Sequence, residues 1–95
     1  MERDDGVRLE RRVRANVLYD LYGPLLTERQ RSVYEMRYFS DLSLAEIAEA
    51  VNVTRQAVHI AVNRTVERLE ALERDLGLAG RLERLENRIK ELEAR

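Results

Sequence analysis

Apolar residues recur every three or four positions along almost the whole chain, and no stretch alternates apolar with polar residues as a strand does. The first apolar stripe is spaced four residues apart, with two more apolar residues beside it: Leu9, Val13, Val17 and Leu21, then Leu18 and Tyr22. This pattern predicts a helix that begins after Asp5 and ends at about Tyr22, where Gly23-Pro24 stops it.

Two capping boxes mark the starts of the next two helices. Thr27-Glu28-Arg29-Gln30 predicts a helix from residue 28 to about 39, and Ser43-Leu44-Ala45-Glu46 predicts a short one from residue 44 to about 50. In each box the hydroxyl accepts from a backbone amide three residues on, and the side chain there reaches back. The residues expected on the buried face of the first of these helices are Val33, Met36 and one or more of Tyr34, Tyr38 and Phe39.

A fourth, longer helix follows a tight joint. Asn52 tolerates the left-handed conformation that such a joint needs, Thr54 caps a helix from residue 55 to about 76, and Gly77 stands at the position of a C-terminal cap. Its apolar seam is Val58, Val62, Thr65, Leu69, Leu72 and Leu76. The last stretch repeats the same spacing with Leu78, Leu82, Leu85, Ile89 and Leu92.

The segment from Leu44 to Val62 has the pattern of a helix-turn-helix. Small Ala48 lets a second helix approach closely, and the positions that two crossed helices must bury are all apolar: Ile47, Val51, Val53, Val58 and Ala61. We therefore predict an all-α protein. Residues 1–76 form a helical domain with the helix-turn-helix at about 43–66, and residues 77–95 form a helical, coiled-coil-like tail.

Composition removes several classes of function. The chain has no cysteine and one histidine, His59, so we expect no disulfide, no metal site and no cofactor. No serine has a nucleophile setting and no glycine-rich loop is present, so we expect no enzyme. The chain contains no apolar run long enough for a membrane span and no secretory signal, so a cytoplasmic protein is expected.

Two groups of residues carry a resemblance to a known family. Leu26-Thr27-Glu28-Arg29-Gln30-Arg31 and Ser43-Leu44-Ala45-Glu46-Ile47-Ala48 resemble region 4 of bacterial sigma factors. Over roughly residues 9 to 75 the chain is more similar still to the YlxM-like family of small sigma-region-4-like proteins, and it departs from that family's pattern at Ile60 and Asn63. The resemblance implies a non-enzymatic protein. Because genes of that family typically lie beside the gene of the signal recognition particle GTPase, it also implies a link to that targeting pathway, through the GTPase or the particle's RNA.

The fourth helix supplies the candidate nucleic-acid-binding residues. Five polar side chains are predicted to face outward: Thr54, Arg55, Gln56, His59 and Asn63. They can read base edges or contact phosphates, and Ile60 can meet a thymine methyl. The alternative is that Arg55 and Gln56 only solvate a first helical turn and that Ile60 belongs to a protein contact. Five arginines against five acids over residues 27–64 predict weak non-specific binding.

The N-terminal helix carries a dense basic cluster, made of Arg8, Arg11, Arg12 and Arg14. It can contact phosphates or an acidic protein. Alternatively it is a solvated face neutralised by Glu10 and Asp20.

The tail indicates self-association. With Leu82 and Ile89 at heptad positions a, a parallel pair sets Arg81 against Glu86 of the partner chain and Arg88 against Glu93, whereas an antiparallel pair brings like charges together. We predict a homodimer whose partner interface consists of Ile60, Leu69, Leu72, Leu76, Leu82, Leu85, Ile89 and Leu92. A tail that folds back on its own domain, or frays, is the alternative.

Two functions fit these patterns. The first is a regulator that binds DNA through the fourth helix. The second is a protein-interaction module that binds a component of the signal recognition particle or of RNA polymerase without DNA. Recognition of the particle's RNA stands between them.

Overall fold

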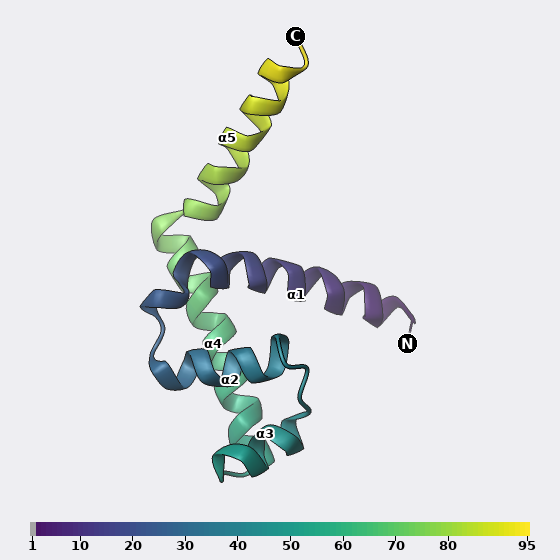
Figure 1. The fold of residues 1–95 in the computed structure, drawn as a ribbon, viewed down its shortest axis with the longest axis vertical. Helices are drawn as coiled ribbons and strands as arrows, with labels where there is room; N and C mark the ends of the chain where they lie inside the picture. Colours follow the sequence, from purple (N-terminus) through teal and green to yellow (C-terminus); the bar gives the residue numbers. More distant parts are fainter. Residues whose placement is uncertain (1) are drawn as a thin grey trace.

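The computed structural model describes the backbone of residues 2–95 and the side chains of residues 9–95. Over that span it contains only helices and turns, which confirms the all-α prediction. The elements are α1 (Glu2–Tyr22), the 3₁₀ turn η1 (Gly23–Leu25), α2 (Glu28–Tyr38), α3 (Leu44–Val51), α4 (Arg55–Leu76) and α5 (Leu78–Glu93). The molecule measures 55 × 33 × 20 Å. Figure 1 shows α1 across the second half of α4, α2 and α3 beside its first half, and α5 leading away from the body.

Both predicted capping boxes are confirmed. Thr27 Oγ1 accepts from the Gln30 amide at 3.1 Å, and Gln30 Oε1 accepts from the Thr27 amide at 3.0 Å. Ser43 and Glu46 make the same reciprocal pair at 3.0 and 2.9 Å. These bonds satisfy orphan amides at the helix starts, which is why the predicted boundaries of α2 and α3 agree with the observed ones to within one residue.

The core has two clusters that meet at Tyr38. One lies where α1 crosses α2 and the second half of α4, and its buried members are Ala15, Leu18, Tyr22, Leu26, Tyr34, Leu69 and Leu72. The other lies where α3 packs on α2 and the first half of α4, and its members are Val33, Ile47, Ala48, Val58 and Val62. The predicted inward face of the fourth helix is therefore confirmed from Val58 through Leu72.

The predicted apolar face of α1 is confirmed only in part. Leu18 and Tyr22, which were predicted beside the four-residue stripe, are buried, and Leu21 of the stripe packs against the first cluster. The rest of the stripe does not pack inward, because Leu9, Val13 and Val17 are 62%, 56% and 48% exposed. A strict four-residue spacing drifts about 40° per step around a helix, so the predicted stripe does not stay on one side. Hydrogen bonds fix the observed rotation, because Tyr34 donates to Asn16 Oδ1 from within the first cluster.

Leu69 and Leu72 require a second correction. We predicted them in a partner interface, but they are 0% and 7% exposed and lie in the chain's own core. The reason is that α1 packs across this part of α4 and covers its apolar seam. Leu76, the last residue of the same seam, is exposed.

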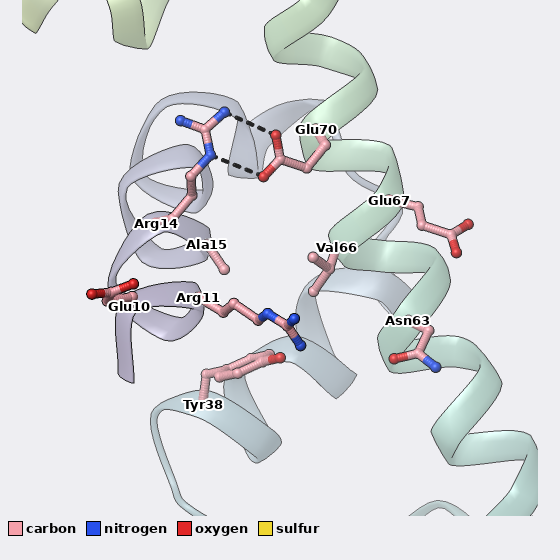
Figure 2. Close-up of a pocket in the computed structure, with 9 residues that line it drawn as sticks. All are labelled: Glu10, Arg11, Arg14, Ala15, Tyr38, Asn63, Val66, Glu67 and Glu70. Atoms are coloured by element: carbon pink, nitrogen blue, oxygen red, sulfur yellow. Dashed lines mark hydrogen bonds and ion pairs between the residues drawn. The ribbon is translucent and has the colours of Figure 1, made fainter. Parts of the chain in front are cut away.

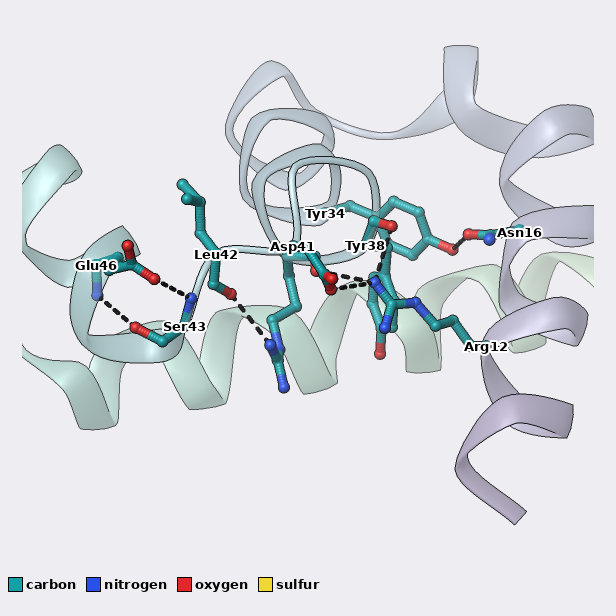
Figure 3. A network of polar contacts seen from close by, with 9 residues as sticks. Arg12, Asn16, Tyr34, Tyr38, Asp41, Leu42, Ser43 and Glu46 are labelled. Atoms are coloured by element: carbon teal, nitrogen blue, oxygen red, sulfur yellow. Dashed lines mark hydrogen bonds and ion pairs between the residues drawn. The ribbon is translucent and has the colours of Figure 1, made fainter. Parts of the chain in front are cut away.

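Side chains of α1 and α2 hold the connection between α2 and α3 (Figure 3). Arg12 donates to Asp41 Oδ1 at 2.8 Å and to the Tyr38 carbonyl at 3.0 Å, and Arg37 donates to the Leu42 carbonyl. Asp41 adopts a left-handed conformation, with φ of 59°. The Arg12 guanidinium lowers the pKa of the Asp41 carboxyl, so this pair remains charged at neutral pH.

The joint between α4 and α5 is built around Tyr22 and Glu73. Tyr22 Oη donates to Glu73 Oε1 at 2.6 Å and accepts from the Leu78 amide at 3.0 Å. Glu73 also accepts from the amides of Ala79 and Gly80, at 3.0 and 3.1 Å. Gly77 makes the turn itself, with φ of 64°. These bonds cap the start of α5 and fix the direction in which it leaves the body.

None of the helices in the described part of the chain is long and apolar enough to cross a membrane.

Candidate nucleic-acid interface

The turn between α3 and α4 has the geometry of a helix-turn-helix. Asn52 is left-handed, with φ 58° and ψ 50°, as its sequence position predicts. The Val53 amide donates back to the Ala48 carbonyl at 3.0 Å, which closes the end of α3. Thr54 then caps α4 by accepting from the Ala57 amide at 3.0 Å. Local hydrogen bonds thus both close the end of α3 and cap the start of α4.

All five predicted contact residues lie exposed on the first half of α4: Thr54, Arg55, Gln56, His59 and Asn63. Val58 and Val62, which alternate with them, are buried against α3. At about 100° per residue, the four polar side chains within α4 lie within about 100° of one another around the helix, next to the buried side, so they form a single surface. We name this surface, defined by the five residues, the recognition face.

Thr54 has two tasks at this surface. Its oxygen is the acceptor of the cap, so a change at this position also weakens the start of the helix. A hydroxyl that accepts one bond can still donate its proton. The hydroxyl of Thr54 therefore keeps its proton and a second lone pair for hydrogen bonds to a ligand at the helix start.

The charge of the first half of α4 is positive. Residues 51–66 include Arg55 and Arg64 and no aspartate or glutamate, and the nearest acids are Glu49 and Glu67. Among the side chains described, neither arginine has an ion-pair partner. Both guanidinium groups are therefore available to an anion.

A groove of about 430 Å³ adjoins the recognition face, between the N-terminus of α2 and α4. Its lining is Arg29, Gln30, Ala57, Ile60, Ala61, Arg64 and Thr65. Ile60 is 44% exposed, and a guanidinium comes from each helix. Sequence reasoning identified Ile60 but missed Arg29 and Arg64 as site residues. Arg64 is one turn beyond Ile60 and was detectable by spacing, whereas Arg29 depends on how α2 crosses α4.

The basic cluster of α1 is engaged within the molecule. Arg14 makes a bidentate pair with Glu70 of α4, at 2.9 and 3.0 Å, and Arg12 is bound to the α2–α3 connection. Arg12 and Arg14 therefore have neither predicted role, a contact with phosphates or an acidic protein, or a solvated face neutralised by Glu10 and Asp20. Their partners lie on α4 and at the α2–α3 connection of the same chain. The side chain of Arg8 lies outside the described residues.

Arg11 remains exposed beside the Arg14–Glu70 pair, in a basin of about 610 Å³ between α1 and α4 (Figure 2). Asn63 stands at the edge of this basin, together with Glu67 and Glu10. The basin thus has charges of both signs, in contrast to the groove beside Ile60. Over residues 9–95 no group of three or more acidic or histidine side chains is placed to hold a metal ion.

The predicted interface residues of the tail are exposed. Leu82, Leu85, Ile89 and Leu92 are 43–56% exposed, and every residue from 81 to 95 is exposed. The structure therefore places the predicted interface residues in three settings. Leu69 and Leu72 lie in the core, Ile60 lies in the groove, and Leu76 and the tail residues are open to solvent.

Comparison with known proteins gives a consistent assignment. Residues 9–95 match the model of the UPF0122 family, described as "Putative helix-turn-helix protein, YlxM / p13 like". A UPF0122 protein of Desulforamulus reducens is 53% identical over 66 residues, which cover 70% of this chain and 56% of that protein. One from Geobacillus kaustophilus is 47% identical over 76 residues, covering 80% and 69%.

A UPF0122 protein of Thermoanaerobacter sp. is 42% identical over 73 residues, covering 77% of this chain and 62% of that protein. The chain thus spans about three fifths of the length of the relatives from Thermoanaerobacter sp. and Desulforamulus reducens. With a family model that matches nearly the whole chain and relatives above 40% identity, the protein belongs to the UPF0122 family of YlxM/p13-like helix-turn-helix proteins.

Proposed function

We propose that this protein is a non-catalytic regulator that binds DNA by placing the first half of α4 in the major groove. The observation that carries the proposal is the recognition face itself. It presents exposed hydrogen-bonding side chains on a helix that Thr54 caps, within a stretch that has no acid and two arginines without an ion-pair partner among the described side chains. The second helix of a helix-turn-helix is the element that reads base edges.

The groove beside Ile60 extends this surface toward the DNA backbone. Arg29 and Arg64 stand on its two walls, and arginine forms bidentate bonds to phosphate. We assign them to backbone contacts, with Arg55 and Gln56 assigned to base edges. The nearly neutral charge of residues 27–64 predicts that non-specific binding is weak and that affinity falls only moderately with salt.

The test begins in cells and ends with a matched pair of variants. Crosslinked, tagged protein is recovered under stringent washing, and the bound DNA and RNA are sequenced separately. A duplex from an enriched site then serves as the probe for Arg55→Ala and for its control Arg68→Ala. The control removes the same charge from an exposed position about 20 Å farther along α4.

We expect discrete DNA sites, and a loss of about 1–3 kcal/mol of binding free energy for Arg55→Ala that Arg68→Ala does not cause. Helix content measured by circular dichroism should be the same in both variants. Equal binding by the two variants would contradict the proposal. Enrichment of the signal recognition particle's RNA without DNA sites would contradict it too, and would favour the targeting-pathway role that the family resemblance implies.

Ile60 favours a second candidate function, a contact with a protein. A half-exposed isoleucine between two guanidinium groups suits an apolar side chain flanked by carboxylates. Purified RNA polymerase and purified signal recognition particle GTPase are the two probes, each immobilised for binding measurements. If either binds through this groove, Ile60→Asp should weaken it by tenfold or more, about 1.4 kcal/mol. Asn63→Asp, which adds the same charge to the recognition face, is the control, and equal effects of the two changes would exclude the groove as the contact.

A further inference from the structure

The helix α5 has an apolar stripe that no described side chain outside α5 covers. Leu78, Leu82, Leu85, Ile89 and Leu92 are each between 41% and 56% exposed, and no residue of α5 is buried. Only its first turn contacts the body, through Ala79 and the amides bound by Glu73. A single helix of this length is marginal in water unless an apolar face is packed.

The joint prevents the stripe from being covered by the same chain. Glu73 and Tyr22 together accept from three consecutive amides, those of Leu78, Ala79 and Gly80. If α5 folded back over α1, these bonds would have to break and would leave part-buried amides and a carboxylate without partners. The tail is thus held away from its own domain, as Figure 1 shows.

The charges that flank the stripe match those of a second copy. In heptad positions the g residues are Arg81, Arg88 and Arg95, and the e residues that carry charge are Glu86 and Glu93. In a parallel pair, g of one helix faces the following e of the other, so Arg81 and Arg88 each meet a glutamate. In an antiparallel pair, arginine meets arginine and glutamate meets glutamate.

The stripe also continues into a groove at the base of α5. This groove, of about 480 Å³, lies between α1 and α5, and its lining is mixed. Val17, Leu21, Ala79 and Leu82 form the apolar part, and Arg14, Asp20, Glu73, Glu83 and Glu86 form the charged part. Leu82 belongs both to this lining and to the heptad seam. Two heptads alone are short for a stable coiled coil. Here the first seam residue, Leu82, lies beside Val17 and Leu21 of α1. Pairing can therefore remove these residues of the body from water in addition to the seam.

We propose that two copies of this chain associate through α5 as a parallel two-stranded coil, with Leu82, Leu85, Ile89 and Leu92 in the seam and Arg81 and Arg88 paired with Glu86 and Glu93 of the partner. Because the strands are parallel, the pair holds both helix-turn-helix units at the same end of the coil. The association does not depend on what the recognition face binds.

Sedimentation over a range of concentrations is the first test. The wild type should run at twice the chain mass of 11.2 kDa and dissociate on dilution. The double variant Arg81→Glu, Arg88→Glu should run at half the wild-type mass, because a parallel pair would then set glutamate against glutamate. The double variant Glu86→Arg, Glu93→Arg should also run at half the wild-type mass, because arginine would then face arginine. An equimolar mixture of the two variants should recover the full mass. Since α5 makes no core contact beyond its first turn, the rest of the fold is expected to survive, which circular dichroism checks.

The absence of cysteine allows a direct test of strand direction. Leu92→Cys places one thiol in the seam, and in a parallel coil the two copies should form a disulfide under mild oxidation. Asn87→Cys, on the outer side of the same helix, is the control and should not. A wild type that remains a monomer at every concentration would overturn the proposal. It would also be overturned by a dimer that survives the Arg81→Glu, Arg88→Glu change, or by one that fails to crosslink through residue 92.

Discussion

The helix-turn-helix and the two outer helices, α1 and α5, differ in where their apolar residues lie. In the helix-turn-helix, Ile47, Val58 and Val62 point inward, and Ile60 is the exception that stays half-exposed on its surface. On α1 and α5, Leu9, Val13 and the tail leucines are exposed although their spacing is as regular. Regular apolar spacing therefore indicates a helix with a face to bury, but it does not say whether the chain itself will bury it.

The largest expected effect is a difference in stability between two neighbouring replacements on α1, one at a buried apolar residue and one at an exposed apolar residue. Leu18 is 1% exposed and Val17 is 48% exposed, one position apart on the same helix. Leu18→Ala leaves a cavity beside Leu69 and should lower the free energy of unfolding by about 2–5 kcal/mol. Val17→Ala should change it by less than about 0.5 kcal/mol. Urea unfolding followed by circular dichroism measures both, and similar losses would mean that α1 packs by the face that the sequence first suggested.

A smaller effect on the free energy of unfolding should come at acidic pH from Glu73, at the joint between α4 and α5. The hydrogen bond from Tyr22 is the main cause that lowers the pKa of Glu73 below its ordinary 4.5. A carboxyl with a lowered folded-state pKa stabilises the fold above its unfolded-state value, and this contribution disappears as the pH falls through the folded-state pKa. The free energy of unfolding should therefore decrease below about pH 4.5, and less steeply in Glu73→Gln. Glu91→Gln, an exposed carboxylate on α5, should keep the wild-type slope. An unchanged slope in Glu73→Gln would show that the joint does not hold in solution.

The parts of the fold that the sequence predicted well are those fixed by neighbouring residues. Thr27 and Ser43 start their helices through partners three residues away, and Asn52 and Gly77 end theirs by their own backbone preference. The recognition face was predictable for the same reason, since one helix with a known start determines which side chains share a side.

What sequence reasoning missed depends on helices that cross. α1 has two apolar edges, and the choice between them follows from Tyr34, which reaches Asn16 from α2. The burial of Leu69, the engagement of Arg14 by Glu70 and the place of Arg29 beside Ile60 have the same origin. Each requires the packing of elements that are 18 to 56 residues apart along the chain.

The helix α4 runs without a break for 22 residues, about 33 Å, from the cap at Thr54 to the turn at Gly77. No flexible linker separates the part that would touch DNA from the part that leads into α5. In the proposed pair, the distance between the two α4 helices would thus be set by the fold. If such a pair binds DNA as proposed, it would discriminate between DNA sites by the number of base pairs between their halves as well as by the bases themselves, since no linker lies between α4 and the paired helix.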